Sequence, residues 1–167
     1  MTAARPQRKA WIRTVRRAGL GLAVVAGLAA RAALAGTTEQ VVADWQTGLA
    51  LSGFDPVAYF TDATPKTGRL EHEYSFAGVT WRFRNEGNRA AFAERPDVYV
   101  PQFGGHDPVA VARGVARPGH PELWLIVENR LYLFYSPEAR DAFRAAPDQV
   151  NADAEEKWPE VVRTLSR

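Results

Sequence analysis

The chain has 167 residues, no cysteine and a formal net charge of +2. The lack of cysteine excludes disulfides, thiolate nucleophiles, iron–sulfur clusters and cysteine zinc sites. Residues 1–35 hold seven of the 21 basic residues and no acidic one, so the remaining 14 basic and 19 acidic residues give residues 36–167 a net charge of about −5. We therefore expect no nucleic-acid partner, because no basic patch remains to neutralise phosphates.

Residues 1–35 have the three-part pattern of a secretory signal peptide. Basic residues precede an apolar run over residues 18–30, and the small-residue sequence Ala33-Leu34-Ala35 follows. The run is shorter than the roughly 20 residues of a bilayer-spanning helix. Arg16-Arg17 resembles a twin-arginine export signal. We expect a cleaved leader and a periplasmic protein whose mature part has no transmembrane span; the alternative is an uncleaved membrane anchor.

Residues 36–50 form a lead-in segment, for which we expect about one helical turn near Val41–Trp45. Beyond it, two patterns recur. GFDPVA at residues 53–58 returns as GHDPVA at residues 105–110, and GVTWRFRNEGNRAAFAERPD at residues 78–97 aligns with NRLYLFYSPEARDAFRAAPD at residues 129–148. A single one-residue gap reconciles the two alignments. Residues 51–160 are therefore interpreted as one domain of two repeat units, about 53–104 and 105–158, followed by a tail at 161–167.

Both units predict the same order of elements. Asp55 and Asp107 each precede a proline, and Asp before Pro favours the start of a short helix. Hairpins follow, with strands at 74–76 and 79–84 and at 123–127 and 131–135, joined at Ala77-Gly78 and Glu128-Asn129. Helices are expected over 86–95 and 137–146, each ended by Pro-Asp, and a last polar helix from about residue 151, interrupted at Pro159.

Aromatic residues recur at equivalent positions of the two units and predict the core. Trp81 and Phe83 alternate on one face of their strand, as Tyr132 and Phe134 do on theirs. The expected fold class is α+β: two pseudo-symmetric copies of a short helix–β-hairpin–helix unit that share one aromatic core.

Several motifs together resemble the YHS-domain family, and most closely its exported bacterial branch. They are GFDPVAYF at residues 53–60, TWRF at 80–83, NRAAFAERPDVYVPQFGG at 88–105, PELWLIVENRLYLFYS at 121–136 and KWPE at 157–160. The resemblance covers about residues 48–159. It implies a small treble-clef-like fold of hairpins and helices and an association with metal handling, above all copper. It implies no established enzymatic activity.

The chain departs from that family at the positions that would carry its chemistry. Related domains have cysteines at the strand–helix turns, where this chain has Asn85 and Ser136. The exported branch commonly has Gly-Gly-Tyr-Cys, sometimes with selenocysteine, where this chain has Gly-Gly-His-Asp at residues 104–107. Thiol-based redox or soft-metal roles are therefore removed. Imidazole and carboxylate groups leave a copper or zinc ion as the possible cofactor.

The 104–107 loop contains the main candidate site residues. Asp107 corresponds to Asp55 and is interpreted chiefly as a helix cap, but His106 corresponds to Phe54 and capping does not explain it. His106, Asp107 and His120 are the candidate metal ligands, although no histidine pair has a ligand spacing such as HxH or HxxxH. The candidate ligand-binding residues, in an aromatic pocket beside the glycines, are Phe103, Gly104, Gly105, His106, Tyr59 and Trp124.

These observations leave three functional hypotheses. The first is an exported, non-enzymatic YHS-type domain that binds a small ligand, a metal ion or a partner protein in the cell envelope. The second is a metal-dependent redox or enzymatic accessory that uses His106, His120 and a carboxylate. The third is a degenerate repeat whose surface serves protein–protein contact. The position of His106 relative to the other histidines and to any pocket distinguishes them.

Overall fold

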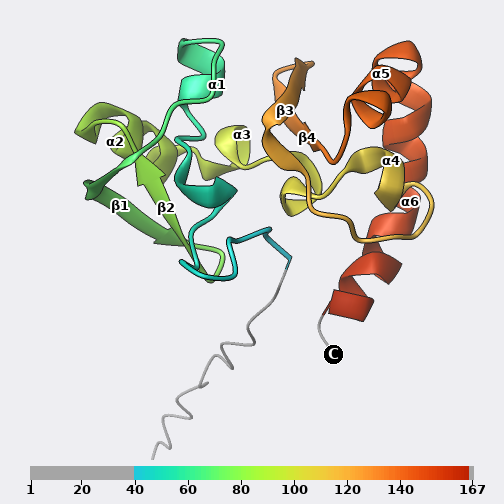
Figure 1. Ribbon diagram of the computed structural model, residues 1–167, viewed down its shortest axis with the longest axis horizontal. Helices are drawn as coiled ribbons and strands as arrows, with labels where there is room; N and C mark the ends of the chain where they lie inside the picture. Colours follow the sequence, from blue (N-terminus) through green and yellow to red (C-terminus); the bar gives the residue numbers. More distant parts are fainter. Residues whose placement is uncertain (1–39, 166–167) are drawn as a thin grey trace, which may run out of the picture. The chain divides into compact units, whose positions relative to one another are not determined.

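The computed structural model describes residues 40–165, so the expected leader in residues 1–35, with Arg16-Arg17, lies outside the described residues. The described chain is mixed α+β with two antiparallel hairpins, which confirms the expected class (Figure 1). Within these residues, no helix combines the length and the apolar character needed to cross a bilayer.

The elements follow the order that the sequence predicts. The first half contains the 3-10 turn η1 (Leu51–Gly53), α1 (Ala58–Thr61), β1 (Arg69–Phe76), β2 (Val79–Phe83), α2 (Glu86–Glu94) and α3 (Pro96–Tyr99). The second half contains η2 (Gln102–Gly105), α4 (Pro108–Val111), β3 (His120–Val127), β4 (Arg130–Phe134), α5 (Pro137–Ala145) and α6 (Pro147–Leu165). In Figure 1, α2 lies beside β1 and β2, whereas α5 lies beside β3 and β4.

Both hairpins turn where the sequence predicts. Ala77 and Gly78 have φ values of 53° and 78°, and Glu128 and Asn129 have φ values of 51° and 58°. Positive φ at both central residues is typical of the type I′ turn, whose twist matches that of the flanking strands. Each hairpin also has an irregular register between its first pair and the rest, before Glu73 in one and before Trp124 in the other.

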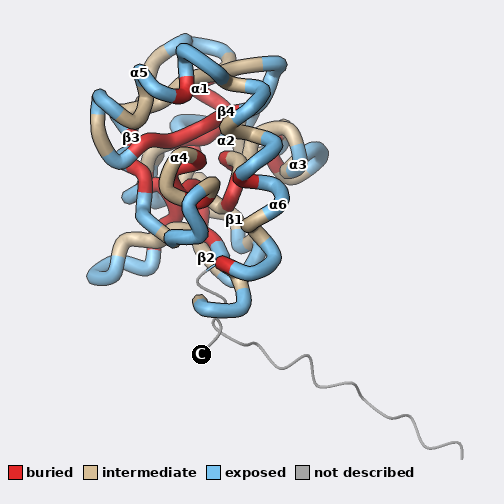
Figure 2. The backbone as a smooth tube through the Cα atoms, turned by 90° about the vertical axis from the view of Figure 1, so that its right-hand side faces the viewer, coloured by how far each residue is buried: buried red, intermediate tan, exposed pale blue. Residues whose placement is uncertain are grey.

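Strand β4 lies between two hydrophobic clusters, where the sequence predicted one shared aromatic core. Its side chains alternate: Leu131 and Leu133 belong to the first cluster, and Tyr132 and Phe134 to the second. All four are buried, and Figure 2 shows β4 within the buried interior. The first cluster is built around Trp81, Phe83 and Phe92, and the second around Tyr132, Phe134 and Phe143. Two clusters thus replace the single expected core, because β4 buries both of its faces.

The expected boundaries need three corrections. Residues 41–50 are not a detached lead-in, because Val41 and Ala50 are buried in the first cluster. The segment has a β-bridge between Ala43 and Ala50. Its one turn, at residues 45–47, is closed by the Gly48 N–H on the Asp44 carbonyl at 2.7 Å, so the expected helical turn lies a few residues later than predicted. Helix α6 runs without interruption through Pro159 to Leu165, so residues 161–165 belong to this helix and not to a separate tail.

The Pro-Asp pairs were predicted to end helices, but each begins one. Pro96 is the first residue of α3 and Pro147 the first residue of α6. Proline suits the first helical position, since its missing N–H would have no partner inside the helix there. The preceding helices, α2 and α5, end at Glu94 and Ala145, one residue before the expected ends.

Candidate functional site

Asp107 is a structural residue, and both of its carboxylate oxygens are used. Oδ1 accepts hydrogen bonds from the backbone N–H groups of Val109 (2.8 Å) and Ala110 (3.4 Å), which caps α4. Oδ2 accepts a hydrogen bond from the backbone N–H of Tyr135, at 2.9 Å, just beyond β4. The side chain is 1 % exposed. The helix-cap interpretation from the sequence is therefore confirmed, and the same carboxylate also ties α4 to the end of β4.

Asp55 makes the matching contacts in the first half. Its Oδ1 accepts a hydrogen bond from the Val57 N–H at 2.9 Å, and its Oδ2 accepts one from the Arg84 N–H at 2.8 Å. The Asn88 side-chain amide adds a third donor at 2.7 Å. Arg84 and Tyr135 lie 51 positions apart, in agreement with the sequence alignment of the two units.

The glycines of η2 are required by the backbone and do not open a ligand site. Phe103, Gly104 and Gly105 have φ values of 53°, 62° and 90°. A Cβ atom on Gly104 would overlap the carbonyl oxygen of Gln40, and the Gly104 carbonyl accepts a 2.8 Å hydrogen bond from the Val42 N–H. The close neighbour at Gly104 is thus the chain's own segment near residue 41, which occupies the approach that the sequence assigned to a ligand.

His106 is buried but forms part of the wall of a hollow. Its side chain is 4 % exposed, and its Nδ1 lies 2.9 Å from the carbonyl oxygen of Phe103. A carbonyl only accepts, so Nδ1 carries the proton and is not available as a metal ligand. The imidazole also lies against Trp158, with ring centroids 5.6 Å apart.

The other histidines lie in different surroundings, and the expected metal site is not formed. His120 is exposed at the start of β3, and its Nδ1 accepts a hydrogen bond from the Glu122 N–H at 3.2 Å. His72 lies in β1, with its Nδ1 3.7 Å from Glu86. Within residues 40–165, no three histidine or carboxylate side chains form a group that could hold a metal ion. The proposed set of His106, Asp107 and His120 is therefore corrected.

Tyr59 and Trp124 belong to the core and not to a pocket beside His106. Tyr59 is 1 % exposed, its hydroxyl donates a 2.9 Å hydrogen bond to the carbonyl of Pro121, and its ring meets that of Trp124 edge-on at 5.4 Å. Burial raises the pKa of Tyr59 well above its ordinary value. Together the two rings connect α1 of the first half to β3 of the second.

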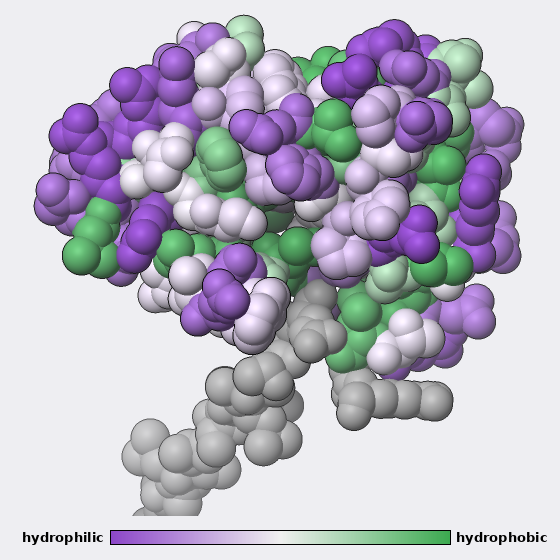
Figure 3. Space-filling view, in the orientation of Figure 1, coloured by the Kyte–Doolittle hydropathy of each residue, from purple (hydrophilic) through white to green (hydrophobic). Residues whose placement is uncertain are grey.

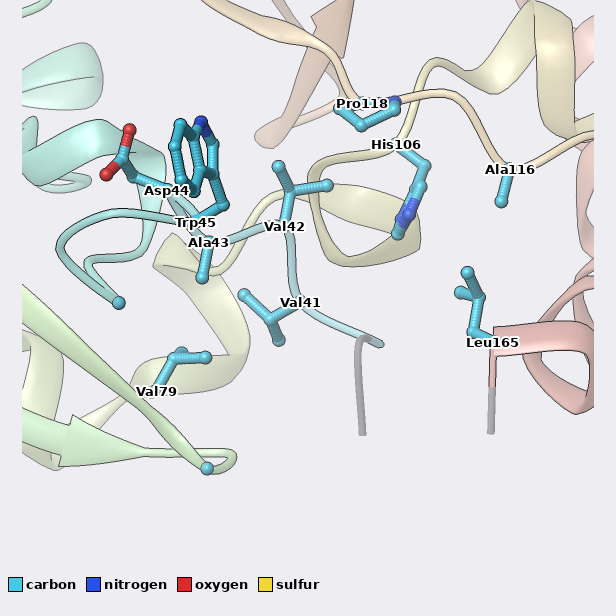
Figure 4. Close-up of a pocket in the computed structure, with 12 residues that line it drawn as sticks. Val41, Val42, Ala43, Asp44, Trp45, Val79, His106, Ala116, Pro118 and Leu165 are labelled. Atoms are coloured by element: carbon cyan, nitrogen blue, oxygen red, sulfur yellow. The ribbon is translucent and has the colours of Figure 1, made fainter. Parts of the chain in front are cut away.

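A groove of about 680 Å³ is the hollow that includes His106 (Figure 4). We call it the His106 groove. His106 and Ala116 extend from one wall, Leu165 extends toward them from the end of α6, and Val79 faces Val41 across the other side (Figure 4). Its lining residues are Val41, Val42, Ala43, Asp44, Trp45, Gly48, Gly78, Val79, His106, Ala116, Pro118 and Leu165. Of the six predicted ligand-binding residues, this groove includes only His106.

A hydrogen-bonded turn presents Trp45 at the groove. Asp44 Oδ1 accepts hydrogen bonds from the Thr47 N–H and the Thr47 hydroxyl, both at 2.8 Å, and from the Gln46 N–H at 3.1 Å. The Thr47 hydroxyl is also the main cause of the lowered pKa of Asp44, which keeps this carboxylate ionised. The Trp45 side chain is left 88 % exposed. Trp45 also lines a second hollow of about 600 Å³, with Phe54, Pro121 and Tyr135.

The surface around these hollows is mixed in character. In Figure 3, hydrophilic residues cover the outer sides of the view over α2 and α5, whereas apolar residues gather near the carboxyl-terminal end of α6, where Leu165 contributes to the groove. An exposed tryptophan beside an apolar hollow is a feature of binding surfaces, because single proteins rarely leave large apolar patches uncovered.

Most groove residues were missed by sequence reasoning because they come from four separate segments. The four segments are Val41–Trp45 with Gly48, Gly78–Val79, Ala116 with Pro118, and Leu165, which are far apart in the sequence and share no motif. One signal was present: a lone tryptophan beside an Asp-x-x-Thr turn, in a segment otherwise classed as a polar lead-in.

Comparison with known proteins identified no relative of this chain. No protein-family model, no curated protein and no solved structure matched this chain.

Proposed function

We propose that this protein is an exported, YHS-type binding module that takes a small apolar ligand in the His106 groove. The observation that carries the proposal is the groove itself. Its volume of about 680 Å³ lies within the roughly 300–1,000 Å³ of small-molecule sites, and valines, a tryptophan and a histidine line it. The sequence motifs at residues 53–60 and 88–105 support the YHS resemblance, and the pattern of residues 1–35 supports export to the periplasm.

We also propose that the two halves are copies of one unit. Supporting this, Asp55 and Asp107 each accept from the amide two residues on and from the amide that follows the second strand. The turns η1 and η2 also share positive φ values at consecutive residues, and both hairpins turn at matching positions. On this view His106 replaces Phe54 of the other copy, so a polar ring enters the groove wall where the first unit keeps an apolar one.

The chemistry of the lining defines the ligand class. Val41, Val42 and Val79 offer apolar contact, and Trp45 offers a ring face that aromatic ligands can stack on. Asp44 stays ionised at the edge of the groove and would repel an organic anion. We therefore propose a neutral or cationic ligand with an aromatic or apolar body. The metal-dependent alternative that uses His106 and His120 has no support from the placement of those side chains.

Calorimetric titration with matched aromatic compounds tests the proposal. Indole is the neutral ligand, tryptamine the cationic one and indole-3-acetate the anionic one. We expect indole and tryptamine to bind more tightly than indole-3-acetate. Trp45→Ala should weaken their binding by about fivefold or more, since losing an aromatic contact costs about 1 kcal/mol.

Leu70→Ala is the matched control, because Leu70 is also a large exposed apolar residue, at 69 %, and does not line the groove. It should leave the affinities unchanged. Equal loss in both variants, or no binding of any of the three compounds, would contradict the proposal.

A further inference from the structure

A third hollow, lined in part by Asp107, has a different chemistry. Its volume is about 370 Å³, and it lies between α4 and the start of α5. We call it the arginine hollow. Its lining residues are Asp107, Val109, Ala110, Arg113, Arg117, Tyr135, Ser136, Glu138, Ala139 and Ala142. It shares no residue with the His106 groove, so its function is separate from the one proposed above.

Among residues 40–165, two guanidinium groups at this hollow have no carboxylate within salt-bridge distance. Within the described part of the chain, no salt bridge or side-chain hydrogen bond involves Arg113 or Arg117. The Arg117 guanidinium carbon lies 4.3 Å from the centre of the Tyr135 ring. Stacking on the tyrosine restricts the arginine and leaves the N–H groups at its edge able to take a planar anion in a two-pronged contact.

At the equivalent place in the first half, the charged side chains pair with each other. Arg84, the counterpart of Tyr135, pairs there with Asp62 at 2.7 Å. In the second half the arginine is replaced by an aromatic ring, and the nearby cations Arg113 and Arg117 face the hollow instead of a protein carboxylate. In the part of the chain that the structure describes, Arg84 is therefore paired with a carboxylate, whereas Arg113 and Arg117 are not.

The polar groups beside the two arginines are already occupied. Three backbone N–H groups satisfy the hydrogen-bonding capacity of the Asp107 carboxylate, which keeps its negative charge at the wall of the hollow. The Ser136 hydroxyl accepts from the Ala139 N–H, so the start of α5 is capped by the chain itself. A hydrogen bond with Ser136 also lowers the pKa of Glu138, which adds one negative charge at the rim.

We propose that the arginine hollow binds a small organic monoanion, a carboxylate with an apolar body. The two guanidinium groups would hold the carboxylate, and the methyl groups of Val109, Ala110, Ala139 and Ala142 would contact the body. The charge of Glu138 opposes ligands with two or more negative charges, which favours a monoanion over phosphate.

The test is a titration of the full chain with benzoate, in which two-dimensional NMR monitors the backbone amides at each step. Benzamide is the neutral control of the same shape, and inorganic phosphate is the control for a bare oxyanion. We expect benzoate to shift the signals of residues 109–117 and 135–142 and to bind in the millimolar range. The double variant Arg113→Gln with Arg117→Gln should weaken benzoate binding by about tenfold or more, because it removes the charge-assisted hydrogen bonds to the carboxylate.

Arg95→Gln is the matched control for the change in charge, since Arg95 is 62 % exposed and lies in the first half, away from this hollow. Its benzoate affinity should equal that of the unsubstituted chain. Arg113 and Arg117 are exposed, so we expect the double variant to keep the fold. Its amide spectrum checks this expectation. Equal binding of benzoate and benzamide, equal or tighter binding of phosphate, or affinity that survives the double substitution would each overturn the proposal.

Discussion

The carboxylate of Asp107 binds the backbone N–H of Tyr135 at 2.9 Å and thereby joins the start of α4 to the end of β4. Because the other oxygen of the same carboxylate caps α4, one buried side chain fixes the loop, the helix and the strand end together. His106, the neighbouring residue, is held in the groove wall by this arrangement and by its own contact with Phe103.

Asp107→Asn should lower the free energy of unfolding by about 1.5–3 kcal/mol, since the amide offers only one accepting oxygen to three backbone donors. Urea denaturation measures this change. Asp153→Asn, at an exposed position of α6, should change it by less than about 0.5 kcal/mol. Similar effects of the two substitutions would refute the structural role given to Asp107.

The substitutions Gly104→Ala and Gly114→Ala distinguish the stability cost of backbone strain from the stability cost of steric overlap. Both glycines have positive φ, at 62° and 76°. An added Cβ would overlap the Gln40 carbonyl at Gly104 but would meet nothing within 4 Å at Gly114. We expect Gly114→Ala to cost about 1–2 kcal/mol from backbone strain alone, and Gly104→Ala to cost clearly more. Thermal unfolding compares them, and a smaller cost at Gly104 would show that the 40–42 segment does not pack there.

Tyr59→Phe should alter the dependence of stability on pH. Burial raises the pKa of Tyr59, so the folded state keeps its proton while the unfolded state loses it near pH 10. This contribution is complete below that pH, and stability falls as the pH rises above it, by up to about 1.4 kcal/mol per pH unit. The phenylalanine variant should lose less stability between about pH 8 and pH 11. Parallel losses, measured by urea denaturation at both pH values, would mean that Tyr59 is not buried as described.

At about pH 8 the same variant should be less stable by about 1 kcal/mol, because the buried Pro121 carbonyl loses its hydrogen-bond donor. This loss is independent of the titration. A variant as stable as the unsubstituted chain at that pH would argue against the link between α1 and β3.

Trp45→Ala should leave stability within about 0.5 kcal/mol of its original value, since the side chain is 88 % exposed. Measured on residues 36–167, which lack Trp11, acrylamide quenching should fall in the variant, because Trp81 is fully buried and Trp124 and Trp158 are partly buried. Trp158→Phe is the comparison, as Trp158 packs on Phe103 and His106. If quenching stayed the same in Trp45→Ala, the exposed turn at residues 44–47 would be misplaced.

The repeat predicted much of the fold because each unit carries its own local signals. Asp107 before Pro108, the two hairpin turns and the caps at Asn85 and Ser136 all act within a few residues, and each was found where expected. The first unit differs, because α1 begins at Ala58, two residues after Pro56, and Asp55 is not its N-cap. The last helix was predicted less well. Pro159 continues α6, and the buried Val161 anchors the following turn, so packing outweighs the cost of a proline inside a helix.

The candidate site was predicted only at His106. The repeat showed that capping could not explain this residue, whereas it did explain Asp107. Tyr59 and Trp124 were assigned to a pocket because aromatic residues suit both cores and ligand sites, and only their mutual packing decides between the two. The partners of His106 in the groove come from distant segments, which no spacing in the sequence brings together.

The most direct test of the central proposal is a map of where a neutral aromatic ligand binds. Indole would be titrated into the protein while two-dimensional NMR follows each backbone amide. We predict saturable shifts concentrated at residues 41–48, 78–79, 105–106 and 116–119, which require about fivefold more indole, or higher concentrations still, in Trp45→Ala. Shifts that cluster elsewhere, or an unchanged spectrum at saturating indole, would contradict the assignment of the His106 groove as the binding site.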